Sequence, residues 1–305
     1  MELTSQKPPK TYGETHYGRM LVEDVANGLV PYRMRGEDFS FSIEPVSEEV
    51  ETIVASGLGR DGYGRRDLLD GVRDFLRDVV QTLMAFGEAP YEIVYFSEGD
   101  ADKMVGFDLS FIAPWTLKRH GGGWVQTIPK DHAERRKMGT RIELPSDSVA
   151  RLQLPPSIER YFRRMMNDLD LLGRDLYPEF GFPGPGSNAQ DIGFDFQAWN
   201  KSHGVALAQA TRECGWTGRG LFSKNVTEYY YVRRFLDFER FKLELRTSIL
   251  SQLNEVLQII GKRMGFAGRI VVEGLPDSAQ ITNSYRDLEA GNVPFSEVKK
   301  PYLGS

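Results

Sequence analysis

The sequence predicts an α+β protein, in which a mixed sheet with helices is followed by a helix pair, one long helix and a small C-terminal αβ segment. Three observations support this class. A helical pattern without glycine or proline extends over residues 226–260. Several segments between residues 91 and 154 are rich in β-branched and aromatic residues. Apolar residues recur at helical spacing over 67–86, 158–176 and 196–212.

The longest helical pattern covers residues 226–264, and we interpret the other elements around it. Thr227 or Asn225 is suited to cap its start, and Gly265 to end it. A helix of this length extends about 60 Å, which is more than one ordinary core covers. We therefore expect it to cross a long domain or to pack beside copies of itself. Its apolar residues share one face: Phe238, Phe241, Leu245, Ile249, Leu253, Val256, Leu257 and Ile260.

The composition limits the possible classes of function. With 305 residues, the chain is long enough for one large or two modest domains. Its net charge of −5 excludes a protein that coats nucleic acid with a basic surface, but it suits one that lets DNA slide past. Cys214 is the one cysteine, which excludes a disulfide framework and fits a reducing, cytoplasmic setting. The N-terminal residues lack the apolar segment of a signal peptide, and no run of about 18 apolar residues predicts a membrane span.

The first elements of the chain are short. Residues 1–18 contain prolines and glycines that disfavour regular structure, so we expect an extended arm there. A short helix is expected over 19–26. A strand is expected over 39–43, where phenylalanine and isoleucine alternate with serine. Residues 47–56 fit a helix or a strand equally.

A helix and a small mixed sheet follow. Residues 67–86 predict a helix with a broad apolar face, and Gly87 is suited to end it in a left-handed conformation. Gly121 to Gly123 predicts the turn of a hairpin. We expect the sheet to be built from strands at 91–96, 107–112, 124–128, 140–144 and 149–154.

Three glycines before the first long helix suggest an alternative function. Gly57, Gly59 and Gly62 spell G-x-G-x-x-G, which in a dinucleotide-binding fold follows a strand and opens a helix. Here the next helix starts later, near Asp67, and a surface loop explains the glycines more simply. A nucleotide-binding enzyme that uses residues 57–62 is the alternative that this motif leaves open.

The C-terminal half predicts helices separated by loops. Prolines and Ser157 start a helix over 158–176, and a second helix is expected over 196–212. The intervening residues 180–187 are too rich in glycine and proline for regular structure. A glycine-rich stretch over 215–224 leads into the long helix, and a strand is expected over 268–274.

The sequence contains no recognisable catalytic motif. There is no Walker A lysine, nucleophile elbow or zinc-binding pair of histidines on a helix. We therefore expect no catalytic residues, no metal, no cofactor and no enzymatic activity. The four histidines are scattered: His16, His120, His132 and His203.

Four stretches, in the same order, resemble the tailed-bacteriophage portal protein family. FGEAPYEIVYF is similar to the family's join of a helix to a strand, and GFDLSFIAPWTLKRH to the strand that runs into a proline-containing turn. RIELPSDSVARLQLP is similar to a later turn before a strand, and QITNSYRDLEAGNVPFSEVKKPYL to the C-terminal pair of short helices. The order and spacing of these stretches carry the resemblance, and the chain would be a short variant.

The resemblance implies a division into family domains. A portal clip is normally a folded subdomain, so the short loop expected in its place departs from the family's pattern. The implied parts are an extended arm over 1–18, a wing-like α+β domain over 19–155, stem-like helices over 156–215 with a clip-like loop at 178–194, a tunnel-like loop over 216–225, the long helix over 226–264, and a strand and short helices over 265–305 that return to the wing or crown.

The resemblance also implies two sets of binding residues. Residues of the tunnel-like loop would face the DNA channel, where Arg219 and Lys224 offer positive charges to phosphates. The channel set is Arg219, Ser223, Lys224 and Asn225, and the set expected to contact the neck or adaptor is Phe180, Phe182 and Asn188.

The function that the resemblance implies is structural. A portal forms a dodecameric homo-oligomeric ring at one capsid vertex, through which DNA is packaged and ejected and to which the neck or tail attaches. The implied partners are the major capsid protein, a terminase that drives translocation, a head–tail adaptor and double-stranded DNA that passes without sequence specificity, with no membrane. The protein would be made in the host cytoplasm and reside in the virion. Another structural or adaptor protein of a phage-like particle is a further alternative.

Overall fold

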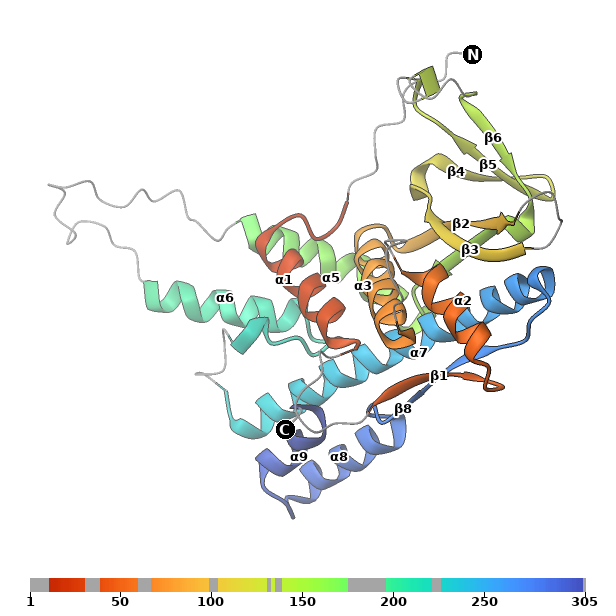
Figure 1. Cartoon of the computed structure of the whole chain (residues 1–305). Coiled ribbons are helices and arrows are strands. Elements are labelled where there is room, and N and C mark those ends of the chain that lie inside the picture. The colour runs from red at the N-terminus through yellow and green to blue at the C-terminus, as the bar shows by residue number, and fades with distance from the viewer. Residues whose placement is uncertain are drawn as a thin grey trace, which may run out of the picture.

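The computed structural model describes residues 11–30, 39–59, 67–98, 104–130, 133–134, 139–174, 196–220 and 226–303. Helices and strands surround one long helix, α7 (Glu228–Met264), which crosses the molecule (Figure 1). The combination of helices with separate sheets confirms the α+β class.

The ends of α7 lie where the sequence predicts them. The Thr227 side chain accepts a hydrogen bond from the amide of Tyr230 at 3.3 Å. Gly265 ends the helix in the left-handed conformation, with a φ of 82°. Because no proline interrupts its backbone hydrogen bonds, the helix extends about 55 Å. The predicted long helix is confirmed.

Two hydrophobic cores receive side chains from α7. Its apolar residues from Phe241 to Ile260 pack into the main core. A second, smaller core holds Val232 and Leu236 against two C-terminal helices, α8 (Ser278–Ala290) and α9 (Phe295–Leu303). The helix that is too long for one ordinary core therefore crosses two cores of the same chain.

Further helices pack on α7 and on the sheets. Helix α3 confirms the prediction for residues 67–86, with Asp67 capping its start and Gly87 in the left-handed conformation at its end. The segment that fits a helix or a strand is the helix α2, because the Ser47 side chain caps it and three glutamates in its first turn complement the helix dipole. These helices are α1 (His16–Gly28), α2 (Glu48–Leu58), α3 (Leu68–Phe86), α5 (Pro156–Arg174) and α6 (Phe196–Ala210).

Helix α1 begins at His16, so the extended arm expected over residues 1–18 is wrong at its C-terminal end. The physical reason is tertiary. Tyr17 is buried in the main core, and Asp170 of α5 lies beside the first turn of α1, where its carboxylate accepts a hydrogen bond from Thr15 at 2.9 Å. A carboxylate at this end of a helix is favoured by the helix dipole. Residues 1–10 of the expected arm lie outside the described residues.

The expectation of one mixed sheet is wrong, because the described strands form three separate antiparallel sheets. One joins β1 (Ser40–Glu44) to β8 (Arg269–Glu273). Another has the order β3-β2-β7, from Met104–Phe111, Glu88–Ser97 and Val149–Gln153. The last has the order β4-β5-β6, from Leu117–His120, Gly123–Thr127 and Arg141–Leu144.

Short turns explain this separation. A 3₁₀ turn at Pro114–Thr116 lies between β3 and β4, and a second at Ser146–Ser148 lies between β6 and β7. Each turn carries the chain from one sheet to the other. The strands that these turns join, β3 with β4 and β6 with β7, therefore lie in different sheets and do not pair. The expected hairpin at residues 121–123 is confirmed as the β4–β5 turn.

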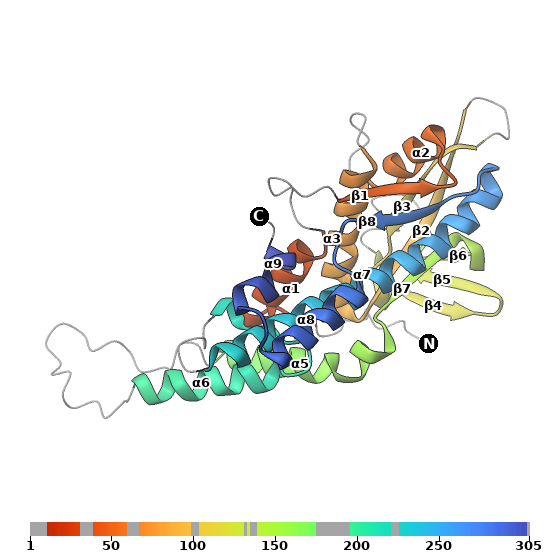
Figure 2. The ribbon, with the colours of Figure 1, turned by 90° about the horizontal axis from the view of Figure 1, so that it is seen from below.

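The helices form layers on both sides of α7. Figure 2 shows α2 and α5 on opposite sides of α7, with α6 beside α5. Helix α1 packs against both α3 and α5. The elements on either side of α7 therefore present two different surfaces of the molecule.

Candidate functional site

Residues 211–220 lead from α6 towards α7, and we refer to them as the pre-α7 segment. They include the first part of the predicted tunnel-like loop, residues 216–220. The segment starts with a turn after α6 and ends with a short 3₁₀ turn at Gly218–Gly220. Its position is fixed by contacts with α7 on one side and α1 on the other.

A buried arginine of α7 holds the pre-α7 segment. Arg234 is 3% exposed, and its Nη2 donates to the Thr211 hydroxyl at 2.7 Å and to the Trp216 carbonyl at 2.8 Å. Both acceptors are buried, and the Thr211 hydroxyl also donates to the Trp216 carbonyl at 2.8 Å, so these polar groups have protein partners in place of water. The segment is thus tied to the first third of α7.

Gly215 brings the two backbones together. It has a φ of 77°, which favours glycine. A Cβ at this position would lie 2.5 Å from both the Arg234 carbonyl oxygen and the Phe238 nitrogen, and 2.4 Å from the Asp237 Cβ. The pre-α7 segment therefore packs directly on the backbone of α7.

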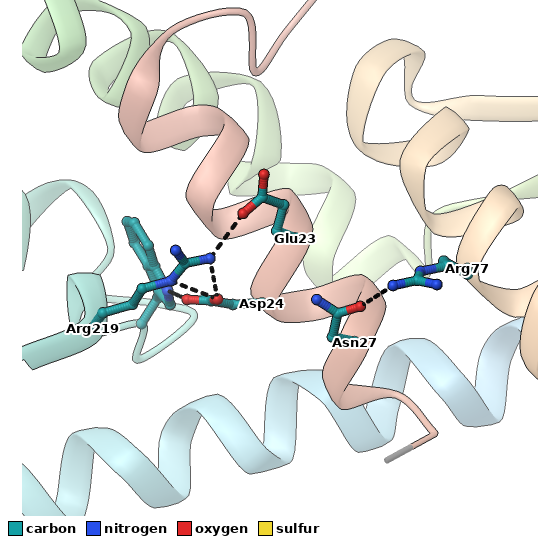
Figure 3. A network of polar contacts seen from close by, with 6 residues as sticks. Glu23, Asp24, Asn27, Arg77 and Arg219 are labelled. Atoms are coloured by element: carbon teal, nitrogen blue, oxygen red, sulfur yellow. Dashed lines mark hydrogen bonds and ion pairs between the residues drawn. The ribbon is translucent and has the colours of Figure 1, made fainter. Parts of the chain in front are cut away.

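An acidic pair on α1 holds the other side (Figure 3). The Trp216 indole donates to Asp24 Oδ2 at 2.8 Å, and Trp216 is 1% exposed. Arg219 lies next to both carboxylates: its Nε donates to Asp24 Oδ1 at 2.9 Å and its Nη2 to Glu23 Oε2 at 2.9 Å. Asn27, one turn further along α1, accepts a hydrogen bond from Arg77 of α3 at 2.6 Å.

The charge of Arg219 is therefore offset within the chain. Its hydrogen bonds raise the pKa of the guanidinium above its ordinary value. The bond to Asp24 has the largest effect, and the bond to Glu23 the second largest. Two carboxylates face one guanidinium, so this cluster has a net negative charge. A phosphate that contacts Arg219 would compete with both carboxylates. Arg219 also has a left-handed backbone, with a φ of 57° and a ψ of 34°.

The ion pairs of Arg219 contribute little to stability because the side chain is 48% exposed. We expect Arg219→Gln to lower the free energy of unfolding by less than about 1 kcal/mol. Urea denaturation of the purified variant measures this change. Arg269→Gln is a matched control, since Arg269 also pairs with an exposed carboxylate, Glu44. A loss above about 2 kcal/mol for Arg219 alone would contradict a surface ion pair.

A second set of charged side chains lies on α7. Lys242 Nζ and Glu239 Oε1 are 2.7 Å apart, and burial raises the pKa of Glu239. Arg246 donates to the carbonyls of Leu29 and Pro276, at 3.2 and 2.7 Å. Burial lowers the pKa of Arg246 to about 10. These groups connect α7 with the end of α1 and with the start of α8, so their arrangement is structural.

Cys214 is enclosed by the same contacts. Burial raises the pKa of its thiol to about 11, and the side chain is 0% exposed. Since the thiolate is the reactive form, we expect iodoacetamide at about pH 8 to modify the folded protein at least about 100-fold more slowly than the urea-unfolded protein. Mass spectrometry of timed aliquots measures both rates. Equal rates in the two states would show that Cys214 is accessible.

Of the residues predicted to face a channel, Arg219 alone lies in the described part of the chain. Ser223, Lys224 and Asn225 lie outside the described residues, and so do Phe180, Phe182 and Asn188 of the predicted neck-binding set. The ends on either side of residues 221–225 are fixed, by Arg219 and by the Thr227 cap of α7.

The glycines 57–62 do not form a dinucleotide-binding turn. Gly57 lies inside α2 and Gly59 directly follows it, so the motif follows a helix instead of a strand. A Cβ on Gly57 would lie 2.5 Å from the Phe107 ring, which gives this glycine a packing role. Gly62 lies outside the described residues. The structural requirement for the nucleotide-binding alternative is therefore contradicted.

The sequence interpretation missed Asp24 and Arg234. Asp24 lies on a short amphipathic helix and its partners are far away in the sequence, so no local pattern identifies it. For Arg234 a signal exists. It lies four residues before Phe238, on the extension of the apolar face of α7, where an arginine needs buried partners.

Neither a membrane-spanning helix nor a candidate metal site lies within the described ranges. Every helix in them is too short or too polar to span a membrane. They also contain no group of three or more histidine, cysteine, aspartate or glutamate side chains placed to hold a metal ion.

Comparison of the fold with solved structures gives matches over nearly the whole chain. A chain in the neck of a native gene transfer agent particle, computed with C12 symmetry, matches 95% of this chain and 90% of its own length, with a TM-score of 0.51 and 12% identity. This chain has the fold of a gene transfer agent neck chain.

Two further structures give the same result. A chain in the neck of an empty gene transfer agent particle, computed with C6 symmetry, covers 94% of this chain and 90% of its own, with a TM-score of 0.53 and 12% identity. A chain in the virion of a native gene transfer agent particle covers 93% and 88%, with a TM-score of 0.50 and 12% identity. No protein-family model matches this sequence, and neither does any curated protein. The likeness to gene transfer agent chains is thus one of fold.

Proposed function

We propose that this chain is a portal-type structural protein of a phage-like particle. Twelve copies form a ring at one capsid vertex, and double-stranded DNA passes through the ring during packaging and ejection. The observation that carries this proposal is the match over 95% of the chain to a chain from a particle neck computed with C12 symmetry. The four ordered stretches that resemble portal proteins support the same function independently of the fold.

The proposed ring gives the pre-α7 segment a role. Because the segment is fixed to α1 and α7 on both sides, it forms a firm base for residues 221–225. We place those residues, with Arg219, at the wall of the channel, and the loop 178–194 at the neck, where Phe180, Phe182 and Asn188 contact the adaptor. The net charge of −5 keeps the DNA from binding tightly as it passes.

The proposed partners follow from the position in the particle. The ring binds the major capsid protein at its rim, the terminase during packaging and the head–tail adaptor afterwards. The protein itself does no ATP hydrolysis, and the terminase supplies that energy.

Negative-stain electron microscopy with light scattering tests the ring. We expect rings with a central hole and a mass of about 415 kDa, twelve times the 34.6 kDa of one chain. If the rings have another mass, the proposed portal function is retained and the proposed number of twelve copies is rejected. A monomer at all protein and salt concentrations, with no rings on the grid, would reject the proposal.

A second function is supported by the two matched chains that come from particle necks: an adaptor protein of a phage-like particle that does not serve as the portal. Affinity purification from cells that make the particle separates the two. A portal retains both terminase and capsid protein, whereas an adaptor retains neither in the absence of the portal.

A further inference from the structure

One exposed face of α5 carries several arginines. Arg160, Arg163 and Arg174 are exposed, and within the described part of the chain none of them forms an ion pair. Their spacing places them on one side of the helix over about 21 Å. Arg164, at the edge of this face, instead pairs with Glu213. We call Arg160, Arg163, Leu171 and Arg174 the α5 face.

The α5 face also exposes an apolar side chain. Leu171 is 58% exposed and lies between Arg163 and Arg174 on the same side of the helix. Arginine together with exposed apolar side chains is the composition enriched in protein–protein interfaces. Phosphate contacts are made by charged and polar groups, so an exposed leucine would contribute nothing to a surface that binds the DNA backbone. The composition of this face therefore favours a protein partner over DNA.

A complementary surface lies at the start of α2. Glu48, Glu49 and Glu51 are in its first turn, and within the described residues none of the three forms an ion pair. Val46, directly before them, is 88% exposed. We call Val46, Glu48 and Glu49 the α2 face, since Glu51 is half-buried and lies on another side of the helix from Glu49. Each of the two faces thus combines charges of one sign with an exposed apolar side chain.

The two helices that carry these faces lie apart, because α5 packs on α1, α1 on α3 and α3 on α2. Figure 2 shows α2 and α5 on either side of α7. In a closed ring each copy uses one surface towards the copy before it and a different surface towards the copy after it. A pair of complementary faces that lie apart satisfies that requirement, whereas two overlapping faces would not.

We propose that the α5 face of one copy binds the α2 face of the next copy around the ring. The arginines pair with the glutamates, and Leu171 and Val46 contribute apolar contact next to them. This inference rests on the proposed ring and specifies the surfaces that close it. Within the described part of the single chain, neither set of charges forms an ion pair.

Charge reversal tests the pairing. We expect Arg160→Glu with Arg163→Glu to lower the fraction of chains in rings at least tenfold at low salt, because like charges then face each other. Adding Glu48→Arg and Glu49→Arg to that variant is expected to restore the rings. Arg119→Glu with Arg141→Glu is the matched control, because both residues are exposed and lie on the β4-β5-β6 sheet. Light scattering measures the mass of each variant.

Disulfide crosslinking tests contact between the faces directly. Arg163→Cys combined with Glu49→Cys is expected to give a ladder of oligomers on mild oxidation, resolved on a non-reducing gel. Each single variant gives no ladder, since the native Cys214 is buried. The interface is rejected if the double variant forms rings but gives no ladder, and if the charge-reversal variant also keeps its rings. The portal function would be retained in that case. Absence of rings in the wild-type protein would overturn both.

A DNA-binding role for the α5 face is a separate outcome of the same variants. Fluorescence anisotropy with a labelled duplex at low salt measures it. If Arg160→Glu with Arg163→Glu leaves the rings intact but weakens duplex binding at least tenfold, the face contacts phosphates and the inter-copy contact is rejected. If the rings dissociate and the affinity of the single chain for the duplex is unchanged, the inter-copy contact is supported.

Discussion

Gly215→Val is expected to lower the free energy of unfolding by about 3 kcal/mol or more. The added side chain meets the backbone of α7 at 2.5 Å, at both the Arg234 carbonyl and the Phe238 nitrogen. A backbone in the middle of a helix cannot move aside without breaking its own hydrogen bonds. The φ of 77° adds strain for any residue with a Cβ. Urea denaturation followed by circular dichroism measures the change.

Gly265→Val is the matched control for this prediction. Gly265 has a φ of 82°, close to that of Gly215, but nothing lies within 4 Å of a Cβ placed there. The control therefore reports the cost of the left-handed backbone alone, about 1–2 kcal/mol. If the two variants lose the same stability, the close contact between the pre-α7 segment and α7 is not present in solution.

Trp216→Ala is expected to cost about 3–5 kcal/mol, because it removes a fully buried aromatic side chain and leaves a cavity. The same change deprives Asp24 of the indole donor at 2.8 Å. Thermal or urea unfolding, followed by far-UV circular dichroism so that the signal does not depend on tryptophan, measures the loss.

Trp216→Phe separates the two contributions. It keeps most of the buried volume and removes the hydrogen bond to Asp24, so we expect a loss of about 1–2 kcal/mol. A loss as large as that of the alanine variant would show that the hydrogen bond, and not packing, holds the segment. No loss in either variant would mean that Trp216 is not buried in solution.

The elements that could be predicted are those with local signals. The ends of α7 and α3 follow from caps a few residues away, Thr227 and Gly265 for one and Asp67 and Gly87 for the other. The apolar face of α7 is confirmed because helical periodicity needs no knowledge of the partner. For residues 47–56 local propensity left two structures open, and the Ser47 cap decided for a helix.

The features that could not be predicted depend on residues far apart in the sequence. The pairing of β1 with β8 joins Ser40 to Glu273, and no local pattern specifies it. The same holds for Arg219, whose residue type suggested a phosphate contact while its position gave it two carboxylates on α1. The division of the expected sheet depends on two 3₁₀ turns, which resemble ordinary strand connections in sequence.

The single helix that crosses both cores has a mechanical consequence. Since α8 and α9 are packed on the first part of α7, while its later part is enclosed by the main core, the two ends cannot move independently. A stiff rod of about 55 Å that tilts by about 5° displaces its far end by about 5 Å. A force on the α8–α9 pair that tilts α7 therefore also displaces β8 and, through its pairing, β1.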